Sequence, residues 1–460
     1  MTSSRTPDAS KLLSLAALMF VFGFGVMLRF QAFTDSEVPT YPHGDAARYF
    51  LYAYNLKNFG VFGNTNMTLL PADTDLETAR STIKPDALVT PGYPAFLSLF
   101  LGGEYAKKQT DSARFVQVLL SALTILLAYA AFAPIRPIYG LGVAALTALS
   151  PHLVNMNLFL LSEPLFCFLL TAFVLTLSYV QAKSSSFLYL VIGLVFALAV
   201  LTRPWLQGYL FILIAYLTLS RLRIHFTKAL LILLGAAIVT APWMLRNTLT
   251  LGAAADTTLT VKSIHHGMYP NMMYEGQSDT LGYAYRADPK APDLEKSLDY
   301  TLSVLTDRAK EKPVEYLKWY LVGKTRMVLS WDIIAGAEAT FVYHVENSPY
   351  FRLPRFYLSR YYMEKIHGAL MLLALVSVAI VWLPRRMQRI ADKNIVFLRA
   401  LSLLVLYFLL MHIIGAPYPR YSIPMRPVLY GMALYPVFLA FHFVASFINA
   451  NIRRLGVHDE

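Results

Sequence analysis

Long apolar runs separated by short polar segments dominate the pattern of this chain. Ten runs reach or approach the roughly 20 residues that an α-helix needs to cross the hydrocarbon core of a bilayer. They are 12–33, 112–133, 138–154, 157–180, 187–202, 205–220, 229–245, 365–383, 395–415 and 425–448. The pattern predicts an all-α polytopic membrane protein with about ten transmembrane helices, and a first helix that is retained as an anchor because its run lacks a small-residue cleavage site.

Basic residues in the short loops give the predicted helices an orientation. With the N-terminus in the cytoplasm, every second loop is basic, as the positive-inside rule requires. The residues placed on this side are Arg5, Lys11, Arg136, Lys183, Arg221, Arg223, Lys228, Arg385, Arg386, Arg389, Lys393, Arg453 and Arg454. We therefore expect both termini in the cytoplasm, with a bacterial inner or plasma membrane as the location.

Two long segments remain for the opposite side of the membrane. The first is 34–111, and the second divides the chain into an N-terminal transmembrane module (1–247), an extracytoplasmic loop (248–364) and C-terminal transmembrane helices (365–460). Within the second, 294–311 has helical periodicity. The segment 313–331 mixes aromatic with basic residues, which predicts an interfacial helix.

Composition agrees with a membrane protein and excludes several other classes. Apolar residues make up 56% of the chain and charged residues 15%, and the mean hydropathy is +0.48. The net charge of +12 comes from the loops between apolar runs, so it does not indicate nucleic-acid binding. The single cysteine, Cys167, rules out an intrachain disulfide.

Charged residues gather at the outer ends of the predicted helices. Asp45 follows the first run in the stretch YPHGDAARYF, and Glu163 begins the fourth run. Three cations, Arg203, Arg246 and Arg420, lie at outer ends of later runs. Because charges at membrane depth need partners or a wet cavity, we expect one outward-facing cavity lined by this set.

This set of residue types suits one kind of chemistry. A carboxylate such as Asp45 can act as general base toward an acceptor hydroxyl. Arginine and lysine side chains stabilise a departing phosphate. The combination is what transfer of a sugar from a lipid-linked phosphate requires, and no glycine-rich nucleotide loop of the Walker type is present.

Structural alternatives stay open for each of these residues. Asp45 could be the N-cap of the following helix, and Glu163 a helix-start acid favoured by the dipole. Each arginine could be an interface anchor that reaches lipid headgroups. Three histidines, His43, His265 and His266, match no metal-ligand spacing, so we expect solvent-exposed loop histidines there and no required metal, although a divalent ion remains possible.

Five stretches resemble the GT-C class of integral-membrane glycosyltransferases, and in particular the glycosyltransferase 39-like group that includes protein mannosyltransferases and the lipid A aminoarabinose transferase. The stretches are GDAARYFLYAYNLKNFGVFG (44–63), TPGYPAFLSLF (90–100), LLSEPLF (160–166), APWMLRN (241–247) and RYSIPMRP (420–427). The second long loop matches nothing in this group.

The resemblance implies a polyprenyl- or dolichyl-phosphate-linked sugar donor and transfer on the periplasmic or lumenal face. It implies that Asp45 is the base, with Glu163 close to it. Some relatives carry a cation immediately before the proline of the second stretch, where this chain has Thr90. The donor phosphate is therefore assigned to a wider group of cations, namely Lys84, Arg80, Arg203, Arg246 and Arg420. The acceptor and sugar pocket is assigned to His43, Arg48, Tyr49, Tyr93 and Tyr421.

Three function classes follow from these observations. The first is an enzyme that transfers a sugar to a glycan, lipid or protein acceptor outside the cytoplasm. The second is a transporter or flippase of lipid-linked sugars, for which inverted repeats and ionisable residues deep in the helices are expected. The third is a non-catalytic assembly factor, in which Asp45 and Glu163 are helix caps.

Overall fold

The structure is a computed structural model that describes residues 9–39, 42–67, 75–101, 107–181, 184–220, 224–334, 336–388 and 390–454. The described part is built from helices, and its only β-type pairings are two isolated bridges, Glu37 with Asn347 and Ala337 with Phe341. Some basic residues that the sequence assigns to the cytoplasm lie outside the described residues. These are Arg5, Lys183, Arg221, Arg223 and Arg389.

Within the described residues, six helices are long and apolar enough to cross a membrane. They are α1 (Ala9–Asp35), α5 (Lys107–Phe132), α11 (Phe226–Leu251), α19 (Pro354–Ile380), α21 (Asp392–Ile414) and α22 (Arg426–Arg454). A bent pair passes the same test together, with a bend of 56° between α6 (Pro137–Leu149) and the segment formed by α7 (Pro151–Asn155) and η2 (Met156–Leu158).

Three shorter apolar segments complete the set. They are α8 (Glu163–Ser178), α9 (Ser186–Thr202), and η3 (Pro204–Leu206) with α10 (Tyr209–Leu219). Every predicted apolar run falls on one of these helices, so the expectation of an all-helical integral membrane protein is confirmed. The count of ten spans stays a prediction.

The predicted boundary between the third and fourth runs is wrong. The break comes at Ser150, because Pro151 cannot continue the ladder of α6, and the chain bends there. The next apolar residues up to 158 belong to the bent segment, and the following helix begins only at Glu163, with Pro164 in its first turn.

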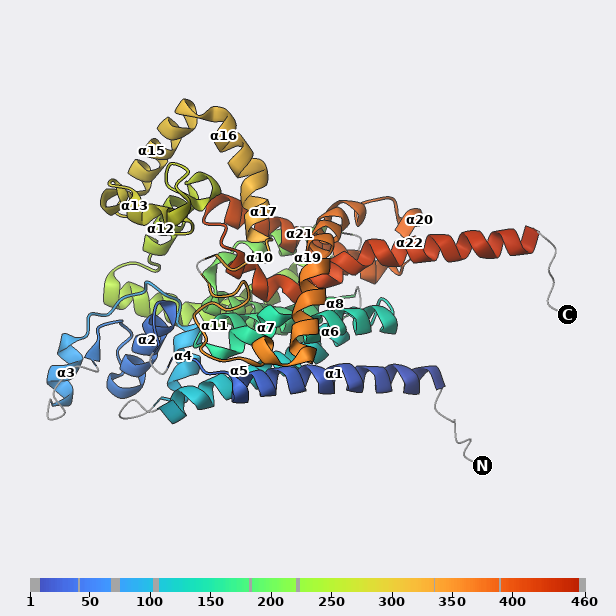
Figure 1. The fold of residues 1–460 in the computed structure, drawn as a ribbon, viewed down its shortest axis with the longest axis horizontal. Helices are drawn as coiled ribbons and strands as arrows, with labels where there is room; N and C mark the ends of the chain where they lie inside the picture. Colours follow the sequence, from blue (N-terminus) through green and yellow to red (C-terminus); the bar gives the residue numbers. More distant parts are fainter. Residues whose placement is uncertain are drawn as a thin grey trace.

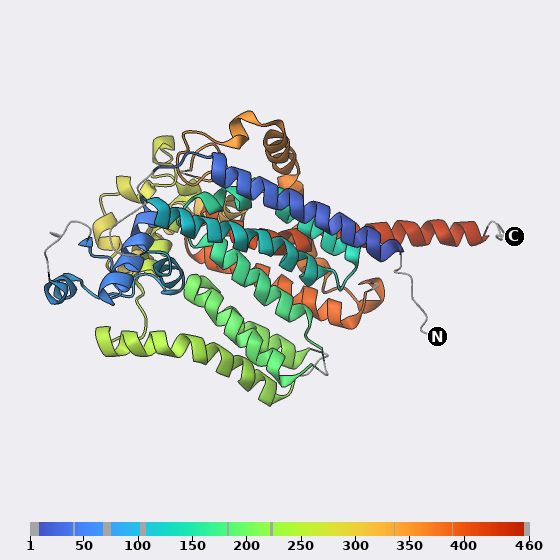
Figure 2. The same cartoon turned by 90° about the horizontal axis from the view of Figure 1, so that it is seen from below.

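The helices of residues 45–98 gather at one end of the bundle, whereas α20 (Arg385–Gln388) lies toward the other end (Figure 1). Figure 1 shows α2 (Asp45–Phe59), α3 (Leu76–Thr82) and α4 (Gly92–Ser98) at the left end, and Figure 2 confirms from a second direction that α1 starts and α22 ends at the opposite end. The two outer segments of the sequence therefore lie on the same side of the helices.

A lobe made by residues 258–328 stands beside these helices (Figure 1). Its elements are α12 (Thr258–Gly267), η4 (Pro270–Met272), η5 (Ser278–Thr280), α13 (Ala284–Ala287), α14 (Ala291–Leu294), α15 (Leu298–Glu311), α16 (Pro313–Lys318), η6 (Trp319–Gly323) and α17 (Lys324–Val328). The lobe has its own small core around Met268, Tyr269 and Leu294. The predicted helix 313–331 is present, but a π-type turn interrupts it and it ends at Val328.

Lys324 joins the lobe to the end of α21. Its ammonium donates to the carbonyls of Ile413 (2.7 Å) and Gly415 (2.9 Å), which α21 leaves without helical partners. Its side chain is fully buried, and burial lowers the pKa of Lys324 from 10.5 to about 7. This contact holds the connection from α21 to α22 against the lobe.

We predict a pH-dependent stability from this lysine. Between about pH 7 and about pH 10 the unfolded chain binds the Lys324 proton more tightly than the folded chain does, so folded stability should rise with pH. Lys324→Met should flatten the rise of Tm over this range, measured in detergent. The exposed Lys318→Met is the matched control, and equal pH slopes in the two variants would contradict the prediction.

Candidate active site

Asp45 is the first residue of α2, and its carboxylate is used in ion pairs rather than in capping. The cap position belongs to Gly44, which has a φ of 58° and makes no side-chain cap bond. Asp45 Oδ2 accepts from Arg420 at 2.5 Å, and Oδ1 lies 3.5 Å from the guanidinium of Arg48. The reading of Asp45 as an N-cap is therefore wrong.

Glu163 lies between two guanidinium groups at the start of α8. Its side chain is 1% exposed, and its Oε1 lies 2.6 Å from Arg203 and 3.0 Å from Arg420. Neither contact is aligned as a hydrogen bond, so both are ion pairs and the carboxylate keeps hydrogen-bonding capacity. Glu163 lies in the first turn of its helix, so the favourable dipole applies as well.

The two arginines reach this carboxylate from distant parts of the chain. Arg203 is the extended residue that ends α9, and Arg420 lies in η7 (Pro419–Met425), the turn that leads into α22. Both guanidiniums lie over the ring of Tyr421, with centroid distances of 5.6 and 5.9 Å. Their side chains are 12% and 19% exposed, so these two arginines turn into the protein instead of reaching for lipid headgroups.

The structure thus brings Asp45, Glu163, Arg203 and Arg420 into one connected set, which we call the carboxylate–arginine cluster. The nearby cations lower the pKa of Asp45 below its ordinary value, with Arg420 as the largest cause. The carboxylate is therefore ionised and able to accept a proton, but in this state Arg420 occupies it. A group that draws Arg420 away would free this carboxylate.

The comparisons with known proteins agree with this fold. Residues 89–245 match a family described as dolichyl-phosphate-mannose-protein mannosyltransferase. The archaeal oligosaccharyltransferase AglB from Archaeoglobus fulgidus, solved with an inhibitory peptide and a dolichol-phosphate, covers 98% of this chain at 13% identity with a TM-score of 0.50. The chain spans about half the length of that protein, 53%. In fold the chain is similar to this oligosaccharyltransferase, and residues 89–245 are similar to the mannosyltransferase family.

Two further solved structures are similar to the chain. A second structure of the same archaeal protein, tethered to an acceptor peptide containing the NVT sequon, gives the same TM-score of 0.50 at 13% identity, covering 98% of this chain and 52% of that one. ArnT from Cupriavidus metallidurans bound to undecaprenyl phosphate covers 94% of this chain and 79% of that one, at 12% identity and a TM-score of 0.33, too low to support an argument. No curated protein sequence matches the chain.

Three of the predicted phosphate-binding cations lie in other surroundings. Arg246 donates to the backbone carbonyls of Asp86 (2.7 Å) and Phe62 (3.0 Å) and stacks on Trp243, so it joins the first outer segment to α11. Arg80 and Lys84 are exposed, at the end of α3 and just beyond it. The contacts that the structure describes for these three do not include the cluster.

Tyr49 and Tyr93, two of the predicted pocket residues, pack beside the cluster. Tyr49 shares a hydrogen bond with Ser162 (3.3 Å), which also accepts from Arg203 Nε (3.1 Å). Tyr93 is buried, packs edge-on against Tyr49 at 4.9 Å and donates to Gln117 at 2.5 Å. Tyr49 thus contacts the cluster through a serine that sequence reasoning missed, although it stands inside the LLSEPLF stretch.

A pocket opens beside Asp45, between the start of α2, the start of α5 and the 158–160 segment. Its lining includes His43, Ala46, Arg114, Phe159 and Tyr343. Tyr343 was not identified from the sequence, because it comes from the long loop that matches no known motif. The ring of Tyr343 packs edge-on against Phe159 (5.3 Å) and against the exposed His43 (5.4 Å).

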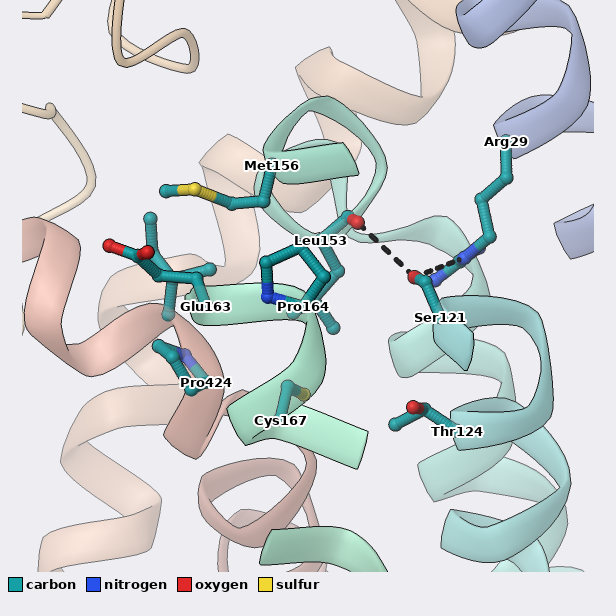
Figure 3. Close-up of a pocket in the computed structure, with 10 residues that line it drawn as sticks. Arg29, Ser121, Thr124, Leu153, Met156, Glu163, Pro164, Cys167 and Pro424 are labelled. Carbon is teal, nitrogen blue, oxygen red and sulfur yellow. Dashed lines mark hydrogen bonds between the residues drawn. The ribbon is translucent and has the colours of Figure 1, made fainter. Parts of the chain in front are cut away.

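A second pocket lies on the other side of Glu163. Figure 3 shows that the carboxylate of Glu163 points away from Arg29, which comes from α1 and donates to Ser121 at 2.8 Å. Arg29 also donates to three backbone carbonyls, those of Gly25, Thr147 and Ala148. A buried cation with this many partners inside the bundle is structural.

The histidines of the outer lobe differ from the sequence expectation. His265 is fully buried on α12 and His266 is half-buried, so the description of both as solvent-exposed loop residues is wrong. Together with Glu295 they form the one His/Cys/Asp/Glu group in the described part of the chain with metal-ligand spacing.

Gly44 gives a prediction about the approach to Asp45. A Cβ at this position would lie 3.1 Å from the Tyr343 hydroxyl, at a φ that L-residues rarely adopt. We expect Gly44→Ala to strain the backbone by about 1–2 kcal/mol and also to move the Asp45 carboxylate. Activity should therefore fall by more than the loss of stability alone explains. Gly252→Ala is the matched control, with a φ of 74° and no atom within 4 Å. Equal activity in the two variants, compared at equal stability, would contradict this.

Proposed function

We propose that the chain transfers a sugar from a polyprenyl- or dolichyl-phosphate-linked donor to an acceptor outside the cytoplasm. The observation that carries the proposal is the carboxylate–arginine cluster, in which one acid is partly open and the other is locked between two cations. The family match and the GT-C fold support the reaction class.

The two acids have different environments and therefore different roles. Asp45 is 37% exposed, and its chain neighbours His43 and Ala46 line a pocket, so an acceptor can reach it. Glu163 is almost fully buried between Arg203 and Arg420, and its Oε1 contacts both guanidiniums. Asp45 acts as the general base, and Glu163 is a positioning residue that holds both guanidiniums.

The donor phosphate completes the arrangement. Its oxygens bind the free N–H groups of Arg203 and Arg420, which are fixed by Glu163 and Tyr421. A phosphate at this position competes with Asp45 for Arg420, so donor binding itself releases the base. This coupling keeps the carboxylate occupied while no donor is present.

In the transfer step, the acceptor atom replaces the lipid phosphate at the anomeric carbon. Asp45 takes the proton of the acceptor hydroxyl or amine as that atom attacks the anomeric carbon. The bond between the anomeric carbon and the phosphate oxygen breaks, and the lipid phosphate leaves with its charge stabilised by Arg203 and Arg420. The products are the glycosylated acceptor and the free lipid phosphate.

The side of the membrane follows from the positive-inside pattern of the loops. The helix α2, which begins at Asp45, lies at the end of the bundle opposite to the start of α1 and the end of α22 (Figure 1). With both termini in the cytoplasm, the site opens to the periplasmic or extracellular face. A glycan, a lipid or a protein on that face is the acceptor.

A reconstitution assay tests the proposal. Proteoliposomes with the purified chain receive polyprenyl phosphate carrying a radiolabelled sugar, together with an envelope extract as acceptor. We expect the label to leave the lipid and join the extract, with release of polyprenyl phosphate. Movement of label across the bilayer with the phosphate bond intact would indicate a flippase instead. Neither event, across a panel of lipid-linked sugars, would favour an assembly factor.

A further inference from the structure

A His–His–Glu group lies in the outer lobe, in contact with the end of α21 but outside the carboxylate–arginine cluster. His265 and His266 end α12, and Glu295 follows α14. Glu295 Oε1 lies 3.9 Å from His265 Nδ1 and 3.4 Å from His266 Nε2. The three ligand atoms lie within 4.8 Å of one another.

The hydrogen bonds behind His265 determine where its proton lies. The Tyr269 hydroxyl donates its only proton to Asp288 Oδ2 at 2.6 Å. It must therefore accept at its other contact, which is His265 Nε2 at 2.7 Å. Nε2 carries the ring proton, and Nδ1 presents a bare lone pair toward Glu295.

This lone pair has no partner of its own. His265 is fully buried, and within the described part of the chain its Nδ1 makes no hydrogen bond. In this buried position the bare nitrogen faces Glu295 Oε1, whose own hydrogen bond is with His266 Nε2 at 3.4 Å, so no hydrogen bond joins the nitrogen to the carboxylate.

We propose that His265 Nδ1, His266 Nε2 and Glu295 Oε1 bind a Zn²⁺ ion. Two ligands of tetrahedral zinc, with bonds of about 2.0–2.2 Å, lie roughly 3.3–3.5 Å apart. The separation of 3.4 Å between His266 and Glu295 meets this requirement, and the 3.9 Å separation to His265 needs a small closure. Imidazole and carboxylate ligands suit zinc among the common divalent ions, and water takes the fourth position.

Around the three ligand atoms, one set of hydrogen bonds favours metal binding and one cation competes with the metal. Asp288, which is paired with Arg308 at 2.7 Å, accepts from Tyr269, and Tyr269 in turn accepts from His265. These hydrogen bonds orient His265 in the way that hydrogen-bond partners behind the ligands orient metal-binding histidines. Lys262 competes, because its ammonium lies 3.0 Å from Glu295 Oε2. Its side chain is 38% exposed, so it can turn to solvent when the ion binds.

The position of the ion gives it a structural role. Ser263, two residues before His265, accepts from the backbone N–H of Ala416 at 3.1 Å, and Tyr418 donates to the carbonyl of Gly282 at 2.7 Å. The lobe therefore holds the segment that leads to Arg420. Zinc that joins α12 to the end of α14 would stiffen this support without contacting the reacting atoms.

Metal titration of the purified full-length chain tests the proposal. After chelation, we expect one Zn²⁺ per chain by calorimetry, a rise in Tm on zinc addition, and the strong visible absorption of tetrahedral cobalt when Co²⁺ replaces it. Glu295→Gln and His265→Gln should each weaken zinc binding at least about 10-fold. Lys262→Met should tighten it by removing the competing charge.

The control is His344→Gln, an exposed histidine outside the group, which should bind zinc as the unchanged chain does. If a ligand variant does not fold, the zinc affinity of Lys262→Met and the cobalt spectrum of the unchanged chain still test metal binding. Absence of stoichiometric zinc, or equal affinity in Glu295→Gln and the unchanged chain, would overturn the proposal. None of these readouts depends on sugar transfer, so their failure leaves the proposed function untouched.

Discussion

Replacing Asp45 with asparagine is expected to lower sugar transfer by about 10²–10⁴-fold, the range that a general base supplies. Asparagine keeps the size of the side chain and can still contact Arg420, but it cannot take the proton from the acceptor. Because the donor phosphate is held by arginines, binding of polyprenyl phosphate should stay within a few-fold of the unchanged chain. The measurement is the transfer rate in proteoliposomes, together with lipid-phosphate affinity.

The matched control is Asp35→Asn. Asp35 is also an aspartate at the outer end of the first helix, but its carboxylate accepts from Gln31 and Thr34 instead of an arginine of the cluster. We expect near-normal transfer in this variant. If Asp45→Asn and Asp35→Asn transfer sugar at similar rates, Asp45 is not the base.

Replacing Glu163 with glutamine should destabilise the chain by about 3–5 kcal/mol, the cost of removing one partner from buried ion pairs. The change leaves Arg203 and Arg420 close together without the anion that both contact. A bound phosphate can replace this anion. We therefore expect polyprenyl phosphate to raise the Tm of Glu163→Gln by more than it raises that of the unchanged chain.

A double-mutant cycle provides the control for this second prediction. Adding Arg203→Gln to Glu163→Gln removes the unpaired cation, so the two substitutions together should cost less than the sum of their separate effects. The extra stabilisation by lipid phosphate should shrink in the double variant. Additive costs, or equal Tm shifts on phosphate binding, would show that the two arginines do not form the phosphate site.

The helices could be read from the sequence because apolar runs of membrane length have few alternative structures. Their breaks were harder to place. The apolar residues on both sides of Ser150 differ little, and the bend at Pro151 depends on packing as well as on the missing N–H. The π-type turn at Trp319–Gly323 likewise has no clear signal in the residue pattern.

The candidate site was readable only in part. Arg203, Arg246 and Arg420 give the same signal, a cation at an outer helix end, and the sequence cannot separate them. Tertiary contacts do: two of them reach Glu163, while Arg246 reaches the carbonyls of Phe62 and Asp86. Because a side chain's partners come from distant segments, residue type and position alone could not identify which cations converge.

The interpretation of Asp45 as an N-cap is wrong because of the backbone conformation of Gly44. A Gly-Asp pair before a helix fits an aspartate cap, but Gly44 adopts a positive φ and takes the cap position. The carboxylate of Asp45 then falls one residue later, in the first turn, where it faces Arg420. The backbone freedom of one glycine thus places the acid in the cluster.

An experimental structure of the chain with bound polyprenyl phosphate tests the central claim most directly. We expect phosphate oxygens within about 3 Å of guanidinium nitrogens of both Arg203 and Arg420. We also expect the carboxylate of Asp45 to be released from Arg420 and turned toward the pocket beside Tyr343. A phosphate bound elsewhere, with the Asp45–Arg420 ion pair intact, would contradict the account.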